Sequence, residues 1–142
     1  MLREIHVASR CRHPCLLQFI GATIDYEGAP LLVTELMGTS LRELLEKRPL
    51  SKTEIHAISL DVARALNYFH QKKPPILHRD VKSTNVLLWR QGNLWRGKVS
   101  DYGSAKLGEQ NVVWSIAPGC IAYSALETSA REQTAKVRNS FW

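Results

Sequence analysis

The stretch ILHRDVKSTNVLL, residues 76–88, places a histidine, an acid, a lysine and an asparagine between two apolar runs. Beyond its centre, NVLLW (85–89) predicts one strand and GKVSD (97–101) predicts a second, joined by a polar turn around RQGN. In the resulting antiparallel hairpin, Asn85 begins one strand and Asp101 ends its neighbour. We therefore expect these two oxygen-bearing side chains to converge.

Four polar residues around this hairpin, Asp80, Lys82, Asn85 and Asp101, form a set that suits phosphoryl transfer. That reaction needs a carboxylate to orient the attacking hydroxyl and accept its proton, and a cation for the transferring phosphate. It also needs oxygen ligands for Mg²⁺. The sequence predicts the first two roles for Asp80 and Lys82 and the metal for Asn85 and Asp101.

Two helices upstream are predicted by capping boxes. Ser40 with Glu43 opens SLRELLEK, and Ser51 with Glu54 opens the longer SKTEIHAISLDVARALNYFHQ. In the longer helix, one apolar stripe at steps of three and four is expected to be buried; its members are Ile55, Ile58, Val62, Leu66 and Phe69. Three polar residues lie off the stripe: Lys52, Asp61 and Arg64.

The first 37 residues predict a helix followed by two strands. MLREIHVASRCR has near-helical spacing of its apolar residues and is stopped by His13-Pro14. LLQFIGATID (16–25) and PLLVTELM (30–37) indicate buried strands joined by a turn at YEG. Residues 102–142 show no clear periodicity.

The composition, 44% hydrophobic and 23% charged over 142 residues, is typical of one soluble globular domain. The net charge of +6 favours anionic partners. Because no Lys/Arg block exceeds two residues, a nucleic-acid binder is disfavoured. Three cysteines without a signal peptide predict reduced thiols and a cytoplasmic location, and CRHPC (11–15) has no second Cys/His pair for zinc. No run is apolar and long enough to predict a membrane span.

With these elements placed, a family resemblance follows. HRDVKSTN (78–85) resembles the catalytic loop of protein kinases, and DYG (101–103) resembles the metal-binding motif that usually reads DFG. LLVTELMGTSLRELL is similar to the kinase hinge and the helix after it, and REIHVASRCRHPCLLQFIGA is similar to the glutamate-helix segment of tyrosine-kinase-like kinases. The resemblance implies a partial α+β kinase fold: an N-lobe remnant (1–33), a hinge (34–38) and a truncated C-lobe (39–142).

The resemblance also implies roles and ligands. ATP and Mg²⁺ would be the cofactors and a protein the substrate, and a lysine two places after the aspartate in RDVKSTN resembles the Ser/Thr type. The implied nucleotide-site residues are the gatekeeper Thr34, the hinge residues Glu35, Leu36 and Met37, Leu87 beneath the base, and the helix glutamate Glu4.

Departures from the family pattern predict impaired activity in this chain. No glycine-rich loop or strand lysine precedes Glu4, and PGCIAYSALE (118–127) carries Cys120 and Leu126 where the family has threonine and proline. TAKVRNSFW lacks the expected aspartate. The alternative is therefore a non-catalytic kinase-like interaction module.

Two further expectations concern partners and regulation. With much of the C-lobe missing, the stripe of the long helix is expected to lose cover and to attract a protein partner. Ser115 is the predicted regulatory phosphosite, with Arg79 as the cation that its phosphate would contact.

Overall fold

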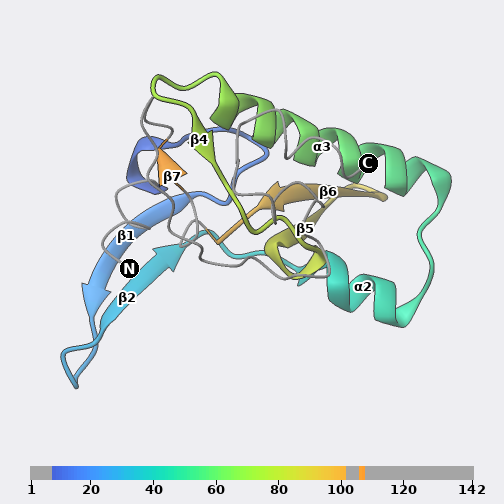
Figure 1. Ribbon diagram of the computed structural model, residues 1–142. Coiled ribbons are helices and arrows are strands. Elements are labelled where there is room, and N and C mark those ends of the chain that lie inside the picture. Colours follow the sequence, from blue (N-terminus) through green and yellow to red (C-terminus); the bar gives the residue numbers. More distant parts are fainter. Residues whose placement is uncertain (1–7, 102–105, 108–142) are drawn as a thin grey trace.

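The computed structural model describes residues 8–101 and 106–107 (Figure 1). The expectations for Glu4, Ser115, Cys120 and Leu126 lie outside these residues. Residues 8–10 are helical, and the later elements are β1 (Phe19–Ile24), β2 (Pro30–Thr34), β3 (Thr39–Ser40), α2 (Leu41–Lys47), α3 (Lys52–His70), β4 (Ile76–Leu77), the 3₁₀ turn η1 (Ser83–Asn85), β5 (Val86–Gln91), β6 (Leu94–Val99) and β7 (Lys106–Leu107). Within the described part, no helix has the length and apolarity needed to cross a membrane.

The hairpin β1–β2 is antiparallel and projects from the rest of the molecule (Figure 1). At its tip the Asp25 carboxylate accepts the N–H groups of Glu27 and Ala29 at 2.9 and 2.7 Å. Both strands lie where the sequence predicts them but are shorter. The residues before β1 pair elsewhere, because Val99 N–H donates to Cys15 O and Leu17 N–H donates to Val99 O, each at 2.9 Å.

The helices α2 and α3 both begin at their predicted caps. The Ser51 hydroxyl accepts the Glu54 N–H at 3.2 Å, and the Glu54 carboxylate accepts the Ser51 N–H at 2.9 Å, which completes the capping box of α3. At α2 the Ser40 hydroxyl accepts the Glu43 N–H at 3.1 Å. These caps satisfy backbone donors that would otherwise lack a partner in the first turn.

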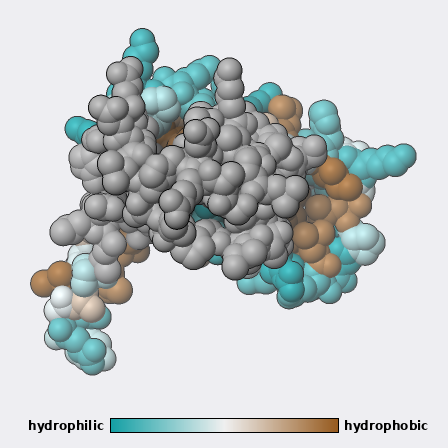
Figure 2. Space-filling view, in the orientation of Figure 1, coloured by the Kyte–Doolittle hydropathy of each residue, from teal (hydrophilic) through white to brown (hydrophobic). Residues whose placement is uncertain are grey.

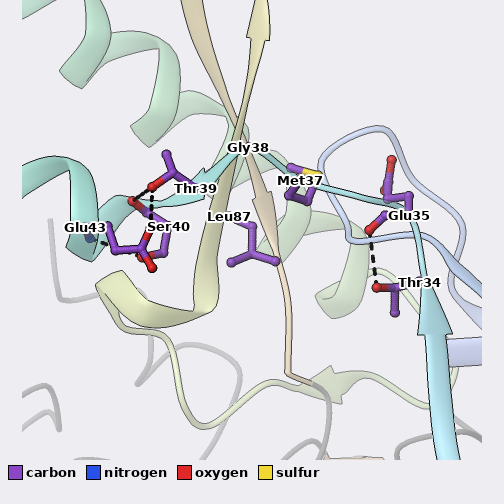
Figure 3. Close-up of a pocket in the computed structure, with 8 residues that line it drawn as sticks. All are labelled: Thr34, Glu35, Met37, Gly38, Thr39, Ser40, Glu43 and Leu87. Carbon is purple, nitrogen blue, oxygen red and sulfur yellow. Dashed lines mark hydrogen bonds between the residues drawn. The ribbon is translucent and has the colours of Figure 1, made fainter.

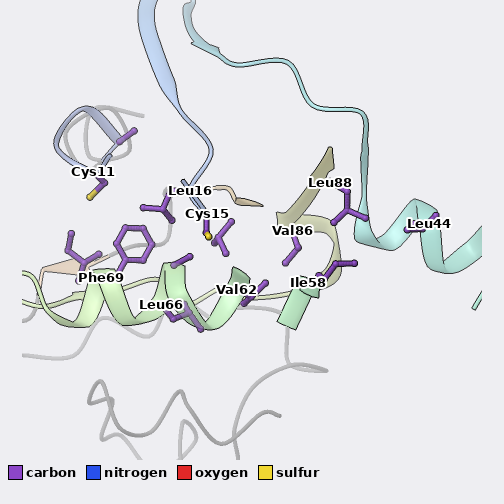
Figure 4. Close-up of a cluster of buried hydrophobic side chains, with 14 residues drawn as sticks. Cys11, Cys15, Leu16, Leu44, Ile58, Val62, Leu66, Phe69, Val86 and Leu88 are labelled. Atoms are coloured by element: carbon purple, nitrogen blue, oxygen red, sulfur yellow. The ribbon is translucent and has the colours of Figure 1, made fainter. Parts of the chain in front are cut away.

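The core lies between α3 and the β5–β6 hairpin, with residues 15–16 completing it (Figures 1 and 4). Most of the predicted stripe is buried: Ile58, Val62, Leu66 and Phe69 are 0–6% exposed. Ile55 is 51% exposed, so its assignment to the buried stripe is wrong. Asp61, predicted to lie off the stripe, is 1% exposed because β6 brings Arg96 and the Gly97 N–H to its carboxylate.

The predicted loss of cover over the stripe of α3 is also wrong, because β6 and the segment before β1 pack on it. Exposed apolar side chains lie elsewhere. Figure 2 shows hydrophobic surface on the β1–β2 hairpin and near α2. The large exposed residues there are Ile20, Ile24, Leu31, Val33 and Leu45.

The β5–β6 hairpin has a two-residue loop, Gly92-Asn93, with Gly92 at φ +60°. Its second strand starts at Leu94, earlier than the predicted Gly97. The ladder extends this far because Arg90 is paired with Trp95 across the strands and its guanidinium lies 4.2 Å from the Trp95 ring centroid. β3 pairs with β5, and β4 pairs with β7.

Candidate active site

The loop after β4 fixes Asp80 through His78. His78 is 2% exposed, and its Nε2 lies 2.8 Å from the Ser100 carbonyl oxygen. Since a carbonyl can only accept, the ring proton belongs on Nε2, which leaves Nδ1 to accept the Asp80 N–H at 3.4 Å. Arg79, between them, has φ +69°. The histidine thus joins the loop to the residue that follows β6.

The Asp80 carboxylate contacts two polar residues of the loop, Lys82 and Asn85. Its Oδ2 accepts from Lys82 Nζ at 2.7 Å and from Asn85 Nδ2 at 3.0 Å. Asn85 Nδ2 also lies 2.9 Å from the Asp80 main-chain oxygen. Asp80 is 8% exposed, and its Oδ2 has one charged and one neutral N–H donor. The carboxylate is therefore held in one orientation at the edge of the core.

Asn85 and Asp101 converge as the hairpin predicts. Asn85 Nδ2 donates to Asp101 Oδ2 at 3.4 Å, and the Asn85 main-chain oxygen accepts from Ser100 N and Ser100 Oγ at 2.8 and 3.1 Å. Asp101 has φ +63°, a left-handed conformation that non-glycine residues adopt rarely. Two carboxylates and one carboxamide therefore gather at the end of β6.

This donor set fits a hard divalent cation. Oxygen ligands suit Mg²⁺, which usually keeps several waters and binds one or two carboxylates together with substrate phosphates. Among the described residues, no group of three or more His, Cys, Asp or Glu side chains could hold a metal ion. A metal here would thus depend on the carboxamide oxygen of Asn85 and on a phosphate-bearing ligand as well as on Asp101.

A pocket of about 380 Å³ lies between the segment after β2 and β5 (Figure 3). Four residues predicted to contact the nucleotide line it: Thr34, Glu35, Met37 and Leu87. Leu36 is 97% exposed and is not among the lining residues. The lining also includes four residues that the sequence reasoning did not select as site residues: Gly38, Thr39, Ser40 and Glu43.

Three of these residues, Thr39, Ser40 and Glu43, form a polar group at one end of the pocket (Figure 3). The Thr39 hydroxyl donates to the Glu43 carboxylate at 2.6 Å, and this bond, followed by one from the Ser40 backbone, lowers the pKa of Glu43. In the sequence, Ser40 and Glu43 predict only a helix cap. Their position directly after the predicted hinge could have indicated the pocket.

The comparison with protein families decides the assignment. The family described as "Protein kinase domain" matches residues 1–141. The chain belongs to the protein kinase family. Its resemblance in HRDVKSTN and DYG is thereby confirmed at the level of the family, and Asp80, Asn85 and Asp101 of this kinase chain lie together in the structure.

Curated relatives are kinases of several organisms. The chain is 35% identical over 132 residues to the serine/threonine-protein kinase TNNI3K of Mus musculus. This match covers 88% of the chain and 15% of the relative. It is 38% identical to the dual specificity protein kinase splA of Dictyostelium discoideum, over 87% of the chain and 6% of the relative. It is 34% identical to the serine/threonine-protein kinase CTR1 of Arabidopsis thaliana, over 75% of the chain and 13% of the relative. The chain thus spans less than a quarter of these relatives.

A solved structure supports the fold. A chain in the crystal structure of the yeast RNA Pol II CTD kinase CTDK-1 complex has a TM-score of 0.82 and 21% sequence identity. The match covers 96% of this chain and 44% of the other. The expected partial kinase-like α+β fold is therefore confirmed.

The segment after β2 is tied to β6 by an ion pair that the sequence did not reveal. Lys98 Nζ lies 2.7 Å from both carboxylate oxygens of Glu35, and Glu35 Oε1 also accepts the Gln18 N–H at 2.6 Å. Lys98 is paired with Leu87 across β5 and β6, so both side chains lie on the same face of the hairpin. The Glu35 carboxylate, on a residue that lines the pocket, is therefore held by β6 and by the segment before β1.

Proposed function

We propose that these residues form the phosphoryl-transfer centre of a Ser/Thr protein kinase, which moves the γ-phosphate of ATP to a protein hydroxyl. The observation that carries the proposal is the cluster of Asp80, Lys82, Asn85 and Asp101, joined by contacts of 2.7–3.4 Å. Lys82 and the serine/threonine kinases among the relatives favour a Ser/Thr hydroxyl and the tyrosine-kinase-like group.

In this proposal Asp80 is the base and orienting group. The substrate hydroxyl oxygen forms a bond to the γ-phosphorus, the bond from that phosphorus to the bridging oxygen of ADP breaks, and the hydroxyl proton passes to Asp80. Lys82, now 2.7 Å from Asp80, supplies positive charge beside the transferring group. The contact from Asn85 Nδ2 to Asp80 keeps the base oriented.

Asn85 and Asp101 would hold Mg²⁺, which supplies charge neutralisation on the phosphates when it is bound. The pocket that includes Thr34, Met37 and Leu87 would take the adenine, with Leu36 and Glu35 contributing main chain beside it. The Thr39, Ser40 and Glu43 oxygens at the pocket's other end suit sugar hydroxyls. Glu4 would pair with a lysine, as the helix glutamate of the family does.

The proposal keeps the expected division into an N-lobe part (1–33), a hinge (34–38) and a C-lobe part (39–142), and the expected cytoplasmic location. Impaired activity of the 142 residues alone is also part of it, because the sequence contains no G-x-G-x-x-G loop. The non-catalytic interaction module is the second candidate, favoured by Leu126 in ALE and by the changed SFW at 140–142. Phosphoryl transfer by a longer chain separates the two, and metal binding tests the site that they share.

Binding of Mn²⁺ with ADP, measured by the relaxation of water protons, tests this site in the chain itself. Mn²⁺ takes the same oxygen ligands as Mg²⁺. Asp101→Asn removes one charged ligand, so we expect the dissociation constant of Mn²⁺·ADP to rise at least about tenfold, which corresponds to about 1.4 kcal/mol. Asp25→Asn, at the tip of β1–β2, is the matched control and should bind as the parent chain does. Equal binding by the parent chain and Asp101→Asn would contradict the metal role.

A further inference from the structure

Asp61 is a buried carboxylate outside the proposed catalytic cluster. It lies on α3 and is 1% exposed, and both of its oxygens are engaged. Oδ1 accepts from Arg96 at 2.6 Å, and Oδ2 accepts from Arg96 Nε at 2.7 Å and from the Gly97 N–H at 3.0 Å. Burial raises the pKa of Asp61, but the Arg96 and Gly97 donors outweigh it and hold that pKa below its usual value.

The same carboxylate reaches a third segment. The Cys15 thiol donates to Asp61 Oδ1 at 3.6 Å, and the Cys15 main-chain oxygen accepts the Val99 N–H at 2.9 Å. Asp61 therefore contacts two segments that flank Val99. One is the part of β6 just before Val99, and the other is the segment around Cys15 that pairs with Val99. A single side chain joins three segments that are distant in sequence.

The segment that Asp61 holds leads directly to the proposed metal ligands. After Val99, Ser100 donates to the Asn85 main-chain oxygen and its own carbonyl oxygen lies 2.8 Å from His78 Nε2. Asp101 follows, 3.4 Å from Asn85 Nδ2. The position of the end of β6 therefore sets how Asp101 lies relative to Asn85 and to the loop that carries Asp80.

Stability alone does not account for a carboxylate at this place. Replacing a buried ion pair by apolar side chains of similar size is often neutral or stabilising. An apolar side chain, however, could not accept the Gly97 N–H and the Arg96 fork together, and so could not define where β6 lies along α3. β6 lies directly on α3 at Gly97, since a Cβ added there would be in van der Waals contact with the Asp61 Cβ at 3.8 Å and with Ile58 Cγ2 at 3.6 Å.

We propose that Asp61 is a positioning residue for the metal–nucleotide site, acting through Arg96, Gly97 and Cys15 on the end of β6. This inference rests on the proposed function of Asn85 and Asp101. Its effect is indirect, because Asp61 contacts Cys15, Arg64, Arg96 and Gly97, which lie outside the proposed catalytic cluster.

The test compares Mn²⁺·ADP binding with thermal stability in four chains: the parent, Asp61→Asn, Asp101→Asn and Leu66→Ala. Leu66→Ala is the control for general destabilisation, because Leu66 is buried on α3 but takes no part in the Asp61 contacts. Binding by each chain is measured at the same number of degrees below that chain's own midpoint of unfolding. We expect Asp61→Asn to raise the dissociation constant at least about fivefold and Leu66→Ala to leave it within about twofold.

The outcomes separate the two claims. If Asp101→Asn weakens binding while Asp61→Asn binds as Leu66→Ala does, Asp61 has only a structural role and the inference is overturned. If Asp101→Asn binds as the parent does, the metal role on which the inference rests is overturned. Should Asp61→Asn fail to fold, Arg96→Lys replaces it in the test. Lysine keeps the positive charge but cannot form the two parallel hydrogen bonds that the Arg96 guanidinium makes with Asp61. Parental binding by Arg96→Lys would overturn the inference.

Discussion

At the scale of single residues, Asp80 is held by donors from its own loop and from the end of η1. Lys82 and Asn85 both donate to Oδ2, while His78 accepts the Asp80 backbone N–H and is itself fixed by the residue after β6. A base that is already oriented loses little entropy when a hydroxyl arrives, and this lowers the barrier to transfer. The loop contacts therefore orient the residues of the proposed chemistry.

Glu54 gives a residue-scale prediction about acid stability. Hydrogen bonds from Arg48 at 2.7 and 2.9 Å, and then from the Ser51 backbone, lower the pKa of Glu54 from 4.5 to about 2. Because the folded pKa lies below the unfolded value, the stabilisation is complete above pH 4.5 and is lost as the pH falls through about 2. Thermal unfolding at a series of pH values should therefore show the advantage of the parent over Glu54→Gln shrinking below pH 4.5.

The control is Glu46→Gln, which breaks an exposed pair with Arg42 whose side chains are 58% and 54% exposed. Exposed pairs of this kind contribute little, so its unfolding temperature should track that of the parent at every pH. A constant difference between the parent and Glu54→Gln down to pH 2 would refute the role given to Glu54.

Residues that act with near neighbours could be predicted, and those that act over long distances in sequence could not. Asn85 and Asp101 follow from the hairpin, and Ser51 with Glu54 from a four-residue pattern. Asp61 was misplaced because helical periodicity treats every charge as a surface residue, while its partner Arg96 is 35 positions away. The partner of Glu35, Lys98, is 63 positions away and equally invisible to local patterns.

At the scale of elements, α3 and the β5–β6 hairpin form the platform beneath the site. Asn85 lies just before the hairpin and Asp101 just past its end, and α3 leads through β4 into the loop with Asp80. Their types and order could be predicted from capping and alternation. Their exact ends could not, because the tip of the hairpin is extended by the cross-strand contact of Arg90 with Trp95.

Two isoleucines of α3 test this packing. Ile58 is 3% exposed beneath β6, whereas Ile55, on the same helix, is 51% exposed. Ile58→Ala removes buried methyl groups and leaves a cavity, so the free energy of unfolding should fall by about 2–5 kcal/mol. Ile55→Ala, the matched control, should change it by about 0.5 kcal/mol or less. Urea unfolding measures both, and equal losses would show that the stripe is not covered as described.

At the scale of the whole molecule, the β1–β2 hairpin leaves apolar side chains exposed on both faces. Ile20 and Ile24 are 66% and 69% exposed, and Leu31 and Val33 are 47% and 41% exposed. Neither strand carries a charged residue that would discourage pairing with another strand. The isolated chain should therefore bind a hydrophobic dye and associate with itself.

Ile24→Lys should lower dye fluorescence and light scattering, roughly by half if this hairpin is the main exposed apolar surface. Thr23→Lys is the control, since it adds the same charge to the same strand without removing an apolar side chain. Equal reduction by both variants would assign the effect to charge alone, and no reduction by either would place the association elsewhere.

The proposed kinase activity belongs to the whole molecule, because the phosphates must be held while the reacting atoms align. The 142 residues contain Asp80, Lys82, Asn85 and Asp101 but no G-x-G-x-x-G loop. We therefore expect turnover by this chain alone to lie several orders of magnitude below that of a longer chain that adds such a loop and a lysine for Glu4.

Transfer of labelled γ-phosphate from ATP to a Ser/Thr peptide by that longer chain, with and without Asp80→Ala, tests the central claim most directly. The account predicts that Asp80→Ala lowers the transfer rate by roughly 10³-fold or more while nucleotide affinity changes only modestly, because the base acts in the transition state. Asp25→Asn serves as the control and should transfer at the parental rate. Near-parental transfer by Asp80→Ala would contradict the assignment of Asp80 as the catalytic base.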